Sequence, residues 1–196
     1  MIVALAEALA RLRAGEVVAY PTETVYGLGV DALSTAAVER LEQLKGRGPE
    51  RGLSLLIAGP AELERWAPDL PERARRLARA FWPGPLTLVV PVPAGPLDRV
   101  ATERGVGFRC SPQPTAAALA SGLGRPLVST SANRSGQPPA TCAAEVSACF
   151  GPELPIAGGE PAGGTAPSSV IALAADGSLT ILREGPISAE KLRAIS

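Results

Sequence analysis

Three polar segments interrupt the apolar pattern of this 196-residue sequence, and they contain the side chains that could do chemistry. They span residues 21–29, 45–51 and 129–136. The first and third directly follow predicted strands, at the edge of the sheet where open α/β folds bind their ligands. The sequence therefore predicts one ligand site that these segments build together.

Lys45 and Arg47 are the cationic part of this predicted site. Gly46 and Gly48 should end the preceding helix, and residues two apart in an extended chain point the same way, so both cations would meet one anion. An ammonium beside a planar guanidinium suits a polyphosphate. A solvated basic turn after a helix explains the same spacing, because a helix C-terminus favours cations. In such a polar loop, replacement by Ala should leave folding almost unchanged.

Hydroxyl and amide side chains crowd the other two segments. They include Thr22, Thr24, Ser129, Ser131 and Asn133. Such groups could donate to phosphate oxygens or a ribose, or they could close Asx and Ser turns on their own backbone. Neither G-x-x-x-x-G-K-[ST] nor G-x-G-x-x-G follows a strand, so a nucleotide would have to bind by another scheme.

The absence of histidine restricts the chemistry most. It removes imidazole bases, Ser-His-Asp and Cys-His nucleophiles and nearly all catalytic zinc sites. The formal net charge of +0 gives no global field that would attract nucleic acid. The three cysteines lack C-x-x-C spacing, which is typical of small buried side chains in a reducing cytoplasm. No run approaches the ~18 apolar residues of a membrane span, so we expect a cytoplasmic protein without a membrane partner.

The elements that must position these side chains follow from apolar periodicity. Helices are predicted over 2–12, 34–46, 71–82, 115–123, 141–150 and 188–195. Strands are predicted over 17–20, 53–58, 86–92, 106–110, 127–130, 169–174 and 178–182, with Asp176-Gly177 as a hairpin turn. Early strands alternate with helices and the chain ends in a hairpin. This order predicts one α/β domain over residues 1–196 with a mixed parallel and antiparallel sheet.

Several motifs, in order along nearly the whole chain, carry a family resemblance. They are residues 20–29 (YPTETVYGLG), Lys45-x-Arg47, 51–53 (RGL), 82–87 (WPGPLT), Arg109, 126–133 (PLVSTSAN) with Ser135-Gly136, 167–169 (PSS) and Arg183-x-Gly185. The sequence resembles the YrdC-like family of L-threonylcarbamoyl-AMP synthases, in its short single-domain bacterial form. The resemblance implies a twisted mixed sheet, flanked by helices, around an open concave pocket.

The resemblance also implies a reaction. Such enzymes use ATP, bicarbonate and L-threonine to form threonylcarbamoyl-AMP and pyrophosphate, as nucleotidyltransferases that act with Mg²⁺. The product passes to a tRNA-modifying transferase complex that makes threonylcarbamoyladenosine in tRNA. Weak binding of double-stranded RNA or tRNA is a further expectation.

Site residues carry over position by position. The family's Lys-x-Arg and Ser-x-Asn elements match Lys45, Arg47, Ser131 and Asn133, which with Arg183 would bind ATP; Lys45 and Arg47 would also be catalytic by neutralising phosphate charge. Threonine-binding positions match Thr22, Arg109, Ser129 and Ser169. Arg109 would pair with the threonine carboxylate through both arms of its guanidinium.

The sequence departs from the family pattern at a few positions. Gly48 replaces the proline usual after Lys-x-Arg, which predicts a looser loop. Residues 110–114 read CSPQP, where the family has a short acidic residue and a histidine before proline. Gln113 could replace a hydrogen bond there but cannot become charged. We therefore expect the threonine side of the site to differ in detail.

Two other functions are compatible with the sequence. An RNA-binding module without catalysis would use an arginine-rich surface that includes residues 73, 75, 76 and 79, although a solvated helix face explains the same run. A carbamoyl-transfer relative with another acceptor is the second alternative. Retention of both the Lys-x-Arg and the Ser-x-Asn residues favours the synthase.

Overall fold

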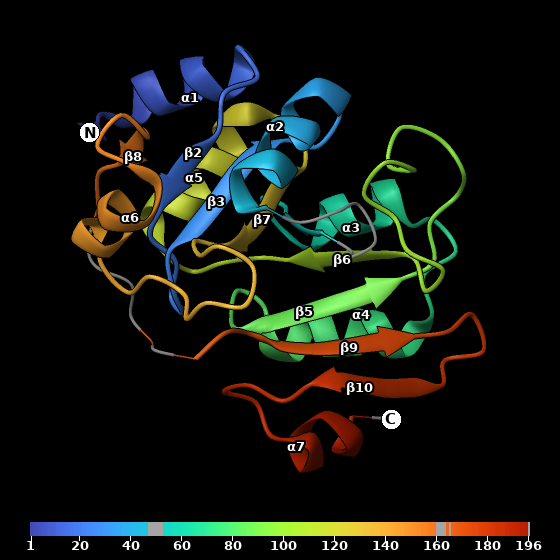
Figure 1. The fold of residues 1–196 in the computed structure, drawn as a ribbon. Coiled ribbons are helices and arrows are strands. Elements are labelled where there is room, and N and C mark those ends of the chain that lie inside the picture. The colour runs from blue at the N-terminus through green and yellow to red at the C-terminus, as the bar shows by residue number, and fades with distance from the viewer. Residues whose placement is uncertain (47–52, 160–163, 165, 196) are drawn as a thin grey trace.

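A computed structural model describes residues 1–46, 53–159, 164 and 166–195. Within these ranges ten strands form one mixed sheet in the order β1-β8-β2-β3-β7-β4-β6-β5-β9-β10 (Figure 1). The strands are β1 (Ile2–Val3), β2 (Val18–Tyr20), β3 (Gly27–Asp31), β4 (Ser54–Leu56), β5 (Leu86–Val90), β6 (Val106–Arg109), β7 (Leu127–Ser131), β8 (Ile156–Ala157), β9 (Ser169–Leu173) and β10 (Leu179–Arg183). The expected α/β class with a mixed sheet is confirmed.

Helices flank this sheet on both faces. They are α1 (Leu5–Arg13), α2 (Thr35–Lys45), α3 (Pro60–Trp66), α4 (Glu72–Phe81), α5 (Pro114–Leu123), α6 (Ala143–Phe150) and α7 (Ala189–Ala194). Figure 1 shows α4 behind β5 and β9, and α7 beside the edge strand β10. Among the described residues, no helix combines the length and apolar character that crossing a membrane requires.

Four of the described elements, β1, β3, β8 and α3, were not expected from the sequence. Strand β3 contains two glycines and an aspartate, which are poor strand formers, and it forms because it pairs with β2 on one side and β7 on the other. Residues 2–3 form β1 instead of the start of a helix, because they pair in parallel with β8. The helix α3 has only seven residues, too few for a periodic signal.

One row of paired residues places small side chains on the same face of the sheet. Gly29 pairs with Ser129, Ser129 with Ser54, Ser54 with Gly107, and Gly107 with Val89. Directly paired residues face the same side, and neighbours along a strand face opposite sides. The adjacent row therefore points to the other face, and it consists of the fully buried Val30, Val128, Leu55, Phe108 and Leu88.

The helices cover these two faces unequally. The aliphatic face packs against α2, α3 and α4 as the main core. On the other face, α1 and α5 cover only one end, where Tyr20, Leu56 and Leu127 pack with Leu12 and Leu119. The remaining part of this face, lined by small side chains, stays open.

Small residues in the row that begins at Gly29 keep the open face free of large side chains. Some of them should also be required because no larger side chain fits between their neighbours. At Gly29, an added Cβ would lie 2.8 Å from Cε1 of Tyr20 and 3.0 Å from the carbonyl oxygen of Val128. We expect Gly29→Ala to lower the free energy of unfolding by about 1–3 kcal/mol, as overpacking does. Urea denaturation measures this change.

Gly59→Ala is the matched control, because no atom lies within 4 Å of a Cβ built there. Gly59 is the N-cap of α3, where Ala is less favourable than Gly, so the effect of Gly59→Ala should stay below about 1 kcal/mol. Equal effects of the two substitutions would contradict the proposed close approach at Gly29.

Candidate active site

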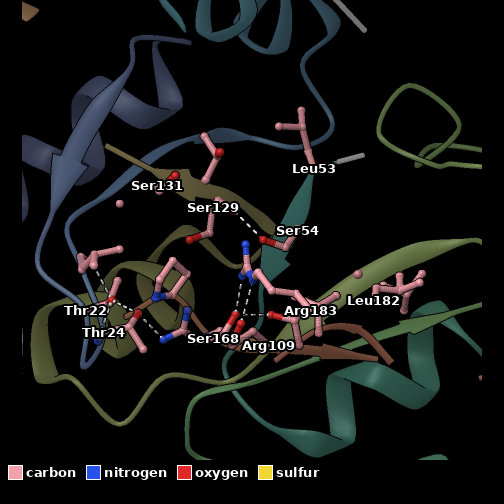
Figure 2. Close-up of a pocket in the computed structure, with 18 of the residues that line it drawn as sticks. Thr22, Thr24, Leu53, Ser54, Arg109, Ser129, Ser131, Ser168, Leu182 and Arg183 are labelled. Carbon is pink, nitrogen blue, oxygen red and sulfur yellow. Dashed lines mark hydrogen bonds between the residues drawn. The ribbon is translucent and has the colours of Figure 1, made fainter. Parts of the chain in front are cut away.

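A cavity of about 450 Å³ occupies the open part of the sheet. Its volume is in the range of small-molecule sites. Glycines, hydroxyl side chains and two arginines contribute to its lining, among them Gly107, Ser54, Thr87, Ser129, Arg109 and Arg183 (Figure 2). The sequence predicted a site at strand ends, whereas the cavity lies over the face of the sheet. The reason is that β3, β7 and β4 are antiparallel neighbours, so their carboxyl ends do not share an edge.

Arg109, at the end of β6, is fixed by a buried ion pair. Its Nε and Nη2 donate to Oε1 of Glu23 over 3.2 and 2.5 Å, and Nη2 also donates to Oγ1 of Thr24 over 2.8 Å. Ser111 donates to the other oxygen of Glu23. These bonds leave Nη1 as the nitrogen that an incoming carboxylate meets first. A two-bond pair through Nη1 and Nη2, as expected from the sequence, would take the Nη2 hydrogen that Thr24 accepts here, while Glu23 keeps the Nε edge.

Arg183, the last residue of β10, is the second guanidinium at the cavity. Its Nε donates to the carbonyl oxygen of Ser168 over 2.9 Å and its Nη2 to the Ser168 hydroxyl over 3.2 Å. That hydroxyl is 2.9 Å from Oγ1 of Thr87. Burial, together with the charge of Arg109, lowers the pKa of Arg183 from its ordinary value.

The cavity wall has an excess of positive charge. In the part of the chain that the structure describes, Glu23 is the one carboxylate that ion-pairs with either of these guanidinium groups. Arginine stays protonated in proteins, so both charges persist even where burial opposes them. An anionic ligand would offset the repulsion between Arg109 and Arg183.

Lys45 lies in the last turn of α2, which corrects the expectation that it sits in a polar loop. Helix α2 begins at the Ser34 cap and ends at Gly46, whose φ of 64° is left-handed. Lys45 is only 3% exposed. Its Nζ donates to the carbonyl oxygens of Ser131 and Asn133, the latter over 2.9 Å. The ammonium thus joins α2 to the backbone that follows β7.

Of the other residues predicted to bind ATP, Ser131 lines the cavity and Asn133 does not. The hydroxyl of Ser131 donates to Oδ1 of Asn133. Asn133 turns toward its own loop, where Nδ2 donates to the carbonyl oxygens of Arg134 and Gln137 over 3.0 and 2.8 Å. Arg47 lies outside the described residues. The structure therefore brings Lys45, Ser131 and Asn133 into one cluster, with Ser131 at the cavity.

Three of the four residues predicted for threonine line the cavity: Thr22, Arg109 and Ser129. Ser169 is fully buried, and its hydroxyl donates to the carbonyl oxygen of Ile187 over 2.8 Å and accepts from the Ile187 amide over 3.0 Å. Its neighbour Ser168 lines the cavity instead. The assignment of Ser169 to threonine stays a prediction.

The lining also includes Ser54, which lies in no quoted motif, and Thr87, which ends the WPGPLT motif and has no predicted role. Ser54 and Thr87 are polar side chains within otherwise apolar strands. Such a side chain, at a position whose strand neighbours are buried and aliphatic, is the signal that could have identified them. Glu23 stood in a motif, but its role as the partner of Arg109 depends on residues 86 positions apart in the chain.

The arginine-rich run, the basis for the RNA-binding alternative, is partly used within the protein. Arg73 donates to the carbonyl oxygens of Ile195 and Arg193, and Arg75 pairs with Glu64 and Glu72. Arg76 and Arg79 also lie 4.0 and 3.7 Å from Glu72, so all four arginines have a partner within the protein, two of them at exposed positions. Binding of RNA stays a prediction of the sequence.

Comparison with known proteins identifies the family. The Sua5/YciO/YrdC family model, described as telomere recombination, matches residues 10–185. The chain belongs to this family. It is 42% identical over 168 residues to the threonylcarbamoyl-AMP synthase of Chromohalobacter salexigens, which covers 85% of this chain and 90% of that relative. The resemblance inferred from the motifs is therefore confirmed.

Longer members of the Sua5/YciO/YrdC family match as well. The threonylcarbamoyl-AMP synthase of Bacillus subtilis is 39% identical over 194 residues, which is 97% of this chain but 56% of that relative. The crystal structure of P. abyssi Sua5 complexed with L-threonine superposes with a TM-score of 0.87 at 36% identity, covering 100% of this chain and 60% of that one. These matches show that the fold is the family fold.

The position of Lys45 in this family fold predicts a cost in stability. Lys45→Ala would leave the carbonyl oxygens of Ser131 and Asn133 without this donor, and a buried unsatisfied polar group costs about 1–3 kcal/mol. We therefore expect the free energy of unfolding to fall by that amount in urea titrations. Lys191→Ala, at an exposed position of α7, should change it little. An unchanged stability of Lys45→Ala would support the original expectation of a polar loop.

Proposed function

We propose that this protein is a threonylcarbamoyl-AMP synthase, a nucleotidyltransferase that forms threonylcarbamoyl-AMP and pyrophosphate from ATP, bicarbonate and L-threonine. The observation that carries the proposal is the pair of guanidinium groups, from Arg109 and Arg183, above a floor of small and hydroxyl side chains in one cavity. Two anionic substrates would balance these charges. Relatives with this name at about 40% identity support the same activity.

The reaction needs no histidine. The threonine amine adds to bicarbonate with loss of water, which gives an N-carboxylate, and an oxygen of this carboxylate attacks the α-phosphorus of ATP. The P–O bond to the β-phosphate breaks, and pyrophosphate leaves. Such phosphorus chemistry depends mainly on positioning and on neutralisation of oxygen charge. Arginine, lysine and hydroxyl groups are sufficient for both tasks.

Arg109, Thr22 and Ser129 would form the threonine side of the cavity. The Nη1 edge of Arg109 would meet the threonine carboxylate, while the two hydroxyl groups would contact its amine or its hydroxyl. The P. abyssi relative was solved with L-threonine bound, which supports an amino-acid subsite in this fold.

Arg183 and Ser131 would form the ATP side, with Lys45 and Asn133 hydrogen-bonded to Ser131. Arg47 is assigned to this side by the family motif alone. The Lys45 ammonium would contact a phosphate directly, beside the two backbone carbonyl oxygens to which it donates. Alternatively Lys45 acts without contacting the phosphate, because its hydrogen bond fixes the backbone of Ser131. The catalytic assignment of Lys45 and Arg47 rests on the family motif.

Mg²⁺ would arrive as part of the ATP substrate. The described residues contain no group of three or more His, Cys, Asp or Glu side chains that could hold a metal ion. Mg²⁺ commonly keeps several waters and binds through substrate phosphates, so it does not require such a group. When bound, it would neutralise charge on the phosphate oxygens.

Further parts of this function rest on the sequence resemblance. We propose that threonylcarbamoyl-AMP passes to a transferase complex that modifies tRNA, and that the protein works in the cytoplasm. Any contact with double-stranded RNA or tRNA would then serve delivery of the product. An acceptor other than threonine is the remaining alternative, and the experiment below separates the two.

Pyrophosphate release should require ATP, Mg²⁺, bicarbonate and L-threonine together, because the attacking group is the carbamate. A coupled phosphate assay, with one component omitted at a time and serine and glycine tested as acceptors, measures this dependence. Equal release in bicarbonate-free buffer would indicate aminoacyl-adenylate chemistry and refute the proposal. Release with another acceptor but not with threonine would favour the alternative.

The same substitution at the two arginines should separate the two substrates. Arg109→Lys keeps the charge but loses the planar donor fork, so the KM for threonine should rise by about 10- to 100-fold, which corresponds to about 1.4–2.7 kcal/mol. Arg183→Lys should raise the KM for ATP instead. Initial rates with each substrate varied, and thermal melts to verify folding, test both. If Arg109→Lys weakened ATP binding as much as threonine binding, its assignment to the amino acid would be wrong.

A further inference from the structure

A two-bond ion pair connects α2 to the long segment between β5 and β6. Nη1 of Arg99 donates to Oε1 of Glu42 over 3.1 Å, and Nη2 donates to Oε2. The Glu42 side chain is 9% exposed and that of Arg99 is 27% exposed. The parallel geometry fixes both the distance and the orientation of the two groups.

Glu42 is at an unfavourable position for a carboxylate. It lies in the last turn of α2, where the helix dipole favours cations, and it is buried. Buried ion pairs contribute little net stability, because desolvation opposes the attraction. Stability of the helix therefore does not explain this residue, whereas a requirement for a fixed geometry does.

The end of α2 is also held from the opposite side. Lys45, one turn beyond Glu42, donates to the carbonyl oxygens of Ser131 and Asn133, and the amide of Ser135 donates back to the carbonyl oxygen of Lys45 over 3.1 Å. The loop after β7 thus depends on the position of the last turn of α2. Ser131, the last residue of β7, lines the cavity.

Arg99 belongs to another wall of the same cavity. Its segment, residues 91–105, rises from the end of β5 and returns to β6 (Figure 1). Leu97 and Val100 anchor this segment in the core, and Thr102 and Gly105 line the cavity. Arg99 belongs to the segment that contains Thr102, and Glu42 belongs to α2, which holds Ser131 in place. The Arg99–Glu42 pair therefore connects these two walls of the cavity.

We propose that Arg99 and Glu42 are positioning residues that set the last turn of α2, and with it Lys45 and Ser131, against the opposite wall at the ATP side of the cavity. This inference rests on the proposed function. Neither residue is in the cavity lining, so the pair acts through Lys45. Loss of the pair should change ATP use and leave threonine binding as it is, because Arg109 is held separately by Glu23.

Kinetics of Arg99→Gln and of the double variant Arg99→Gln/Glu42→Gln test the proposal. The single variant leaves a buried carboxylate without its partner, so the KM for ATP should rise by about 5- to 20-fold, in the range of effects that a small misplacement produces. The KM for threonine should stay within about two-fold. The double variant, with two neutral amides, should recover part of the loss. Arg11→Gln breaks a pair with Glu7 on the surface of α1 and should change neither constant.

Hydrogen exchange of the Ser135 amide gives a second readout that needs no activity. In Arg99→Gln this amide should exchange about ten-fold faster, since local opening of the last turn of α2 breaks its bond to Lys45. The amide of Ala19, bonded to the carbonyl oxygen of Pro155 over 2.9 Å, should be unchanged.

The outcomes distinguish this inference from the proposed function. If Arg99→Gln raised both KM values equally, the positioning role would be overturned. The same holds if the variant lowered the melting temperature without changing the KM for ATP, because the pair would then only stabilise the fold. A wild-type protein that releases no pyrophosphate would instead refute the proposed function. In that case the Ser135 exchange rate still decides whether the pair holds the end of α2.

Discussion

Side chains alternate across a pleated sheet, and this constraint determines both the core and the cavity. The row through Ser129, Ser54 and Gly107 places small groups on one face, and the next row, through Val128, Leu55 and Phe108, places large apolar groups on the other. A shift of one residue in any strand would exchange the two faces. The antiparallel and parallel pairings of β7, β4 and β6 thus secure the core and the site at once.

The open face of the sheet buries little apolar surface. Hydrogen bonds and an ion pair fix its side chains instead. Arg109 is held by Glu23 and Thr24, and Arg183 by Ser168, so each guanidinium is ordered before a ligand arrives. Preorganised charges of this kind are worth more to a reaction than mobile ones, because no reorganisation is required as charge develops. A chain without histidine can therefore support phosphorus chemistry with permanently charged groups.

Most of the fold could be predicted from the sequence, because seven of the ten described strands and six of the seven described helices follow from its apolar patterns and turn residues. Strand β3 could not, since its pairing with β2 and β7 overrides the poor propensity of Gly27 and Gly29. The motifs predicted which segments form the site, but not the burial of Lys45 or the contacts of Ser169. Those depend on partners distant in the chain, such as Asn133 and Ile187, which periodicity does not reveal. Arg47 lies outside the described residues, so its role stays a prediction.

The departure from the family pattern at residues 110–114 lies behind the cavity and not in it. Oε1 of Gln113 accepts the Ala116 amide over 2.9 Å and so caps α5, and Ser111 donates to Glu23. Gln113 is therefore two residues from the hydroxyl that orients the carboxylate partner of Arg109. A neutral side chain at this position keeps the helix cap without adding charge near the Glu23–Arg109 pair. The sequence change thus lies within two residues of the hydroxyl that orients Glu23 on the Nε edge of Arg109, and residues 110–114 are not part of the cavity lining.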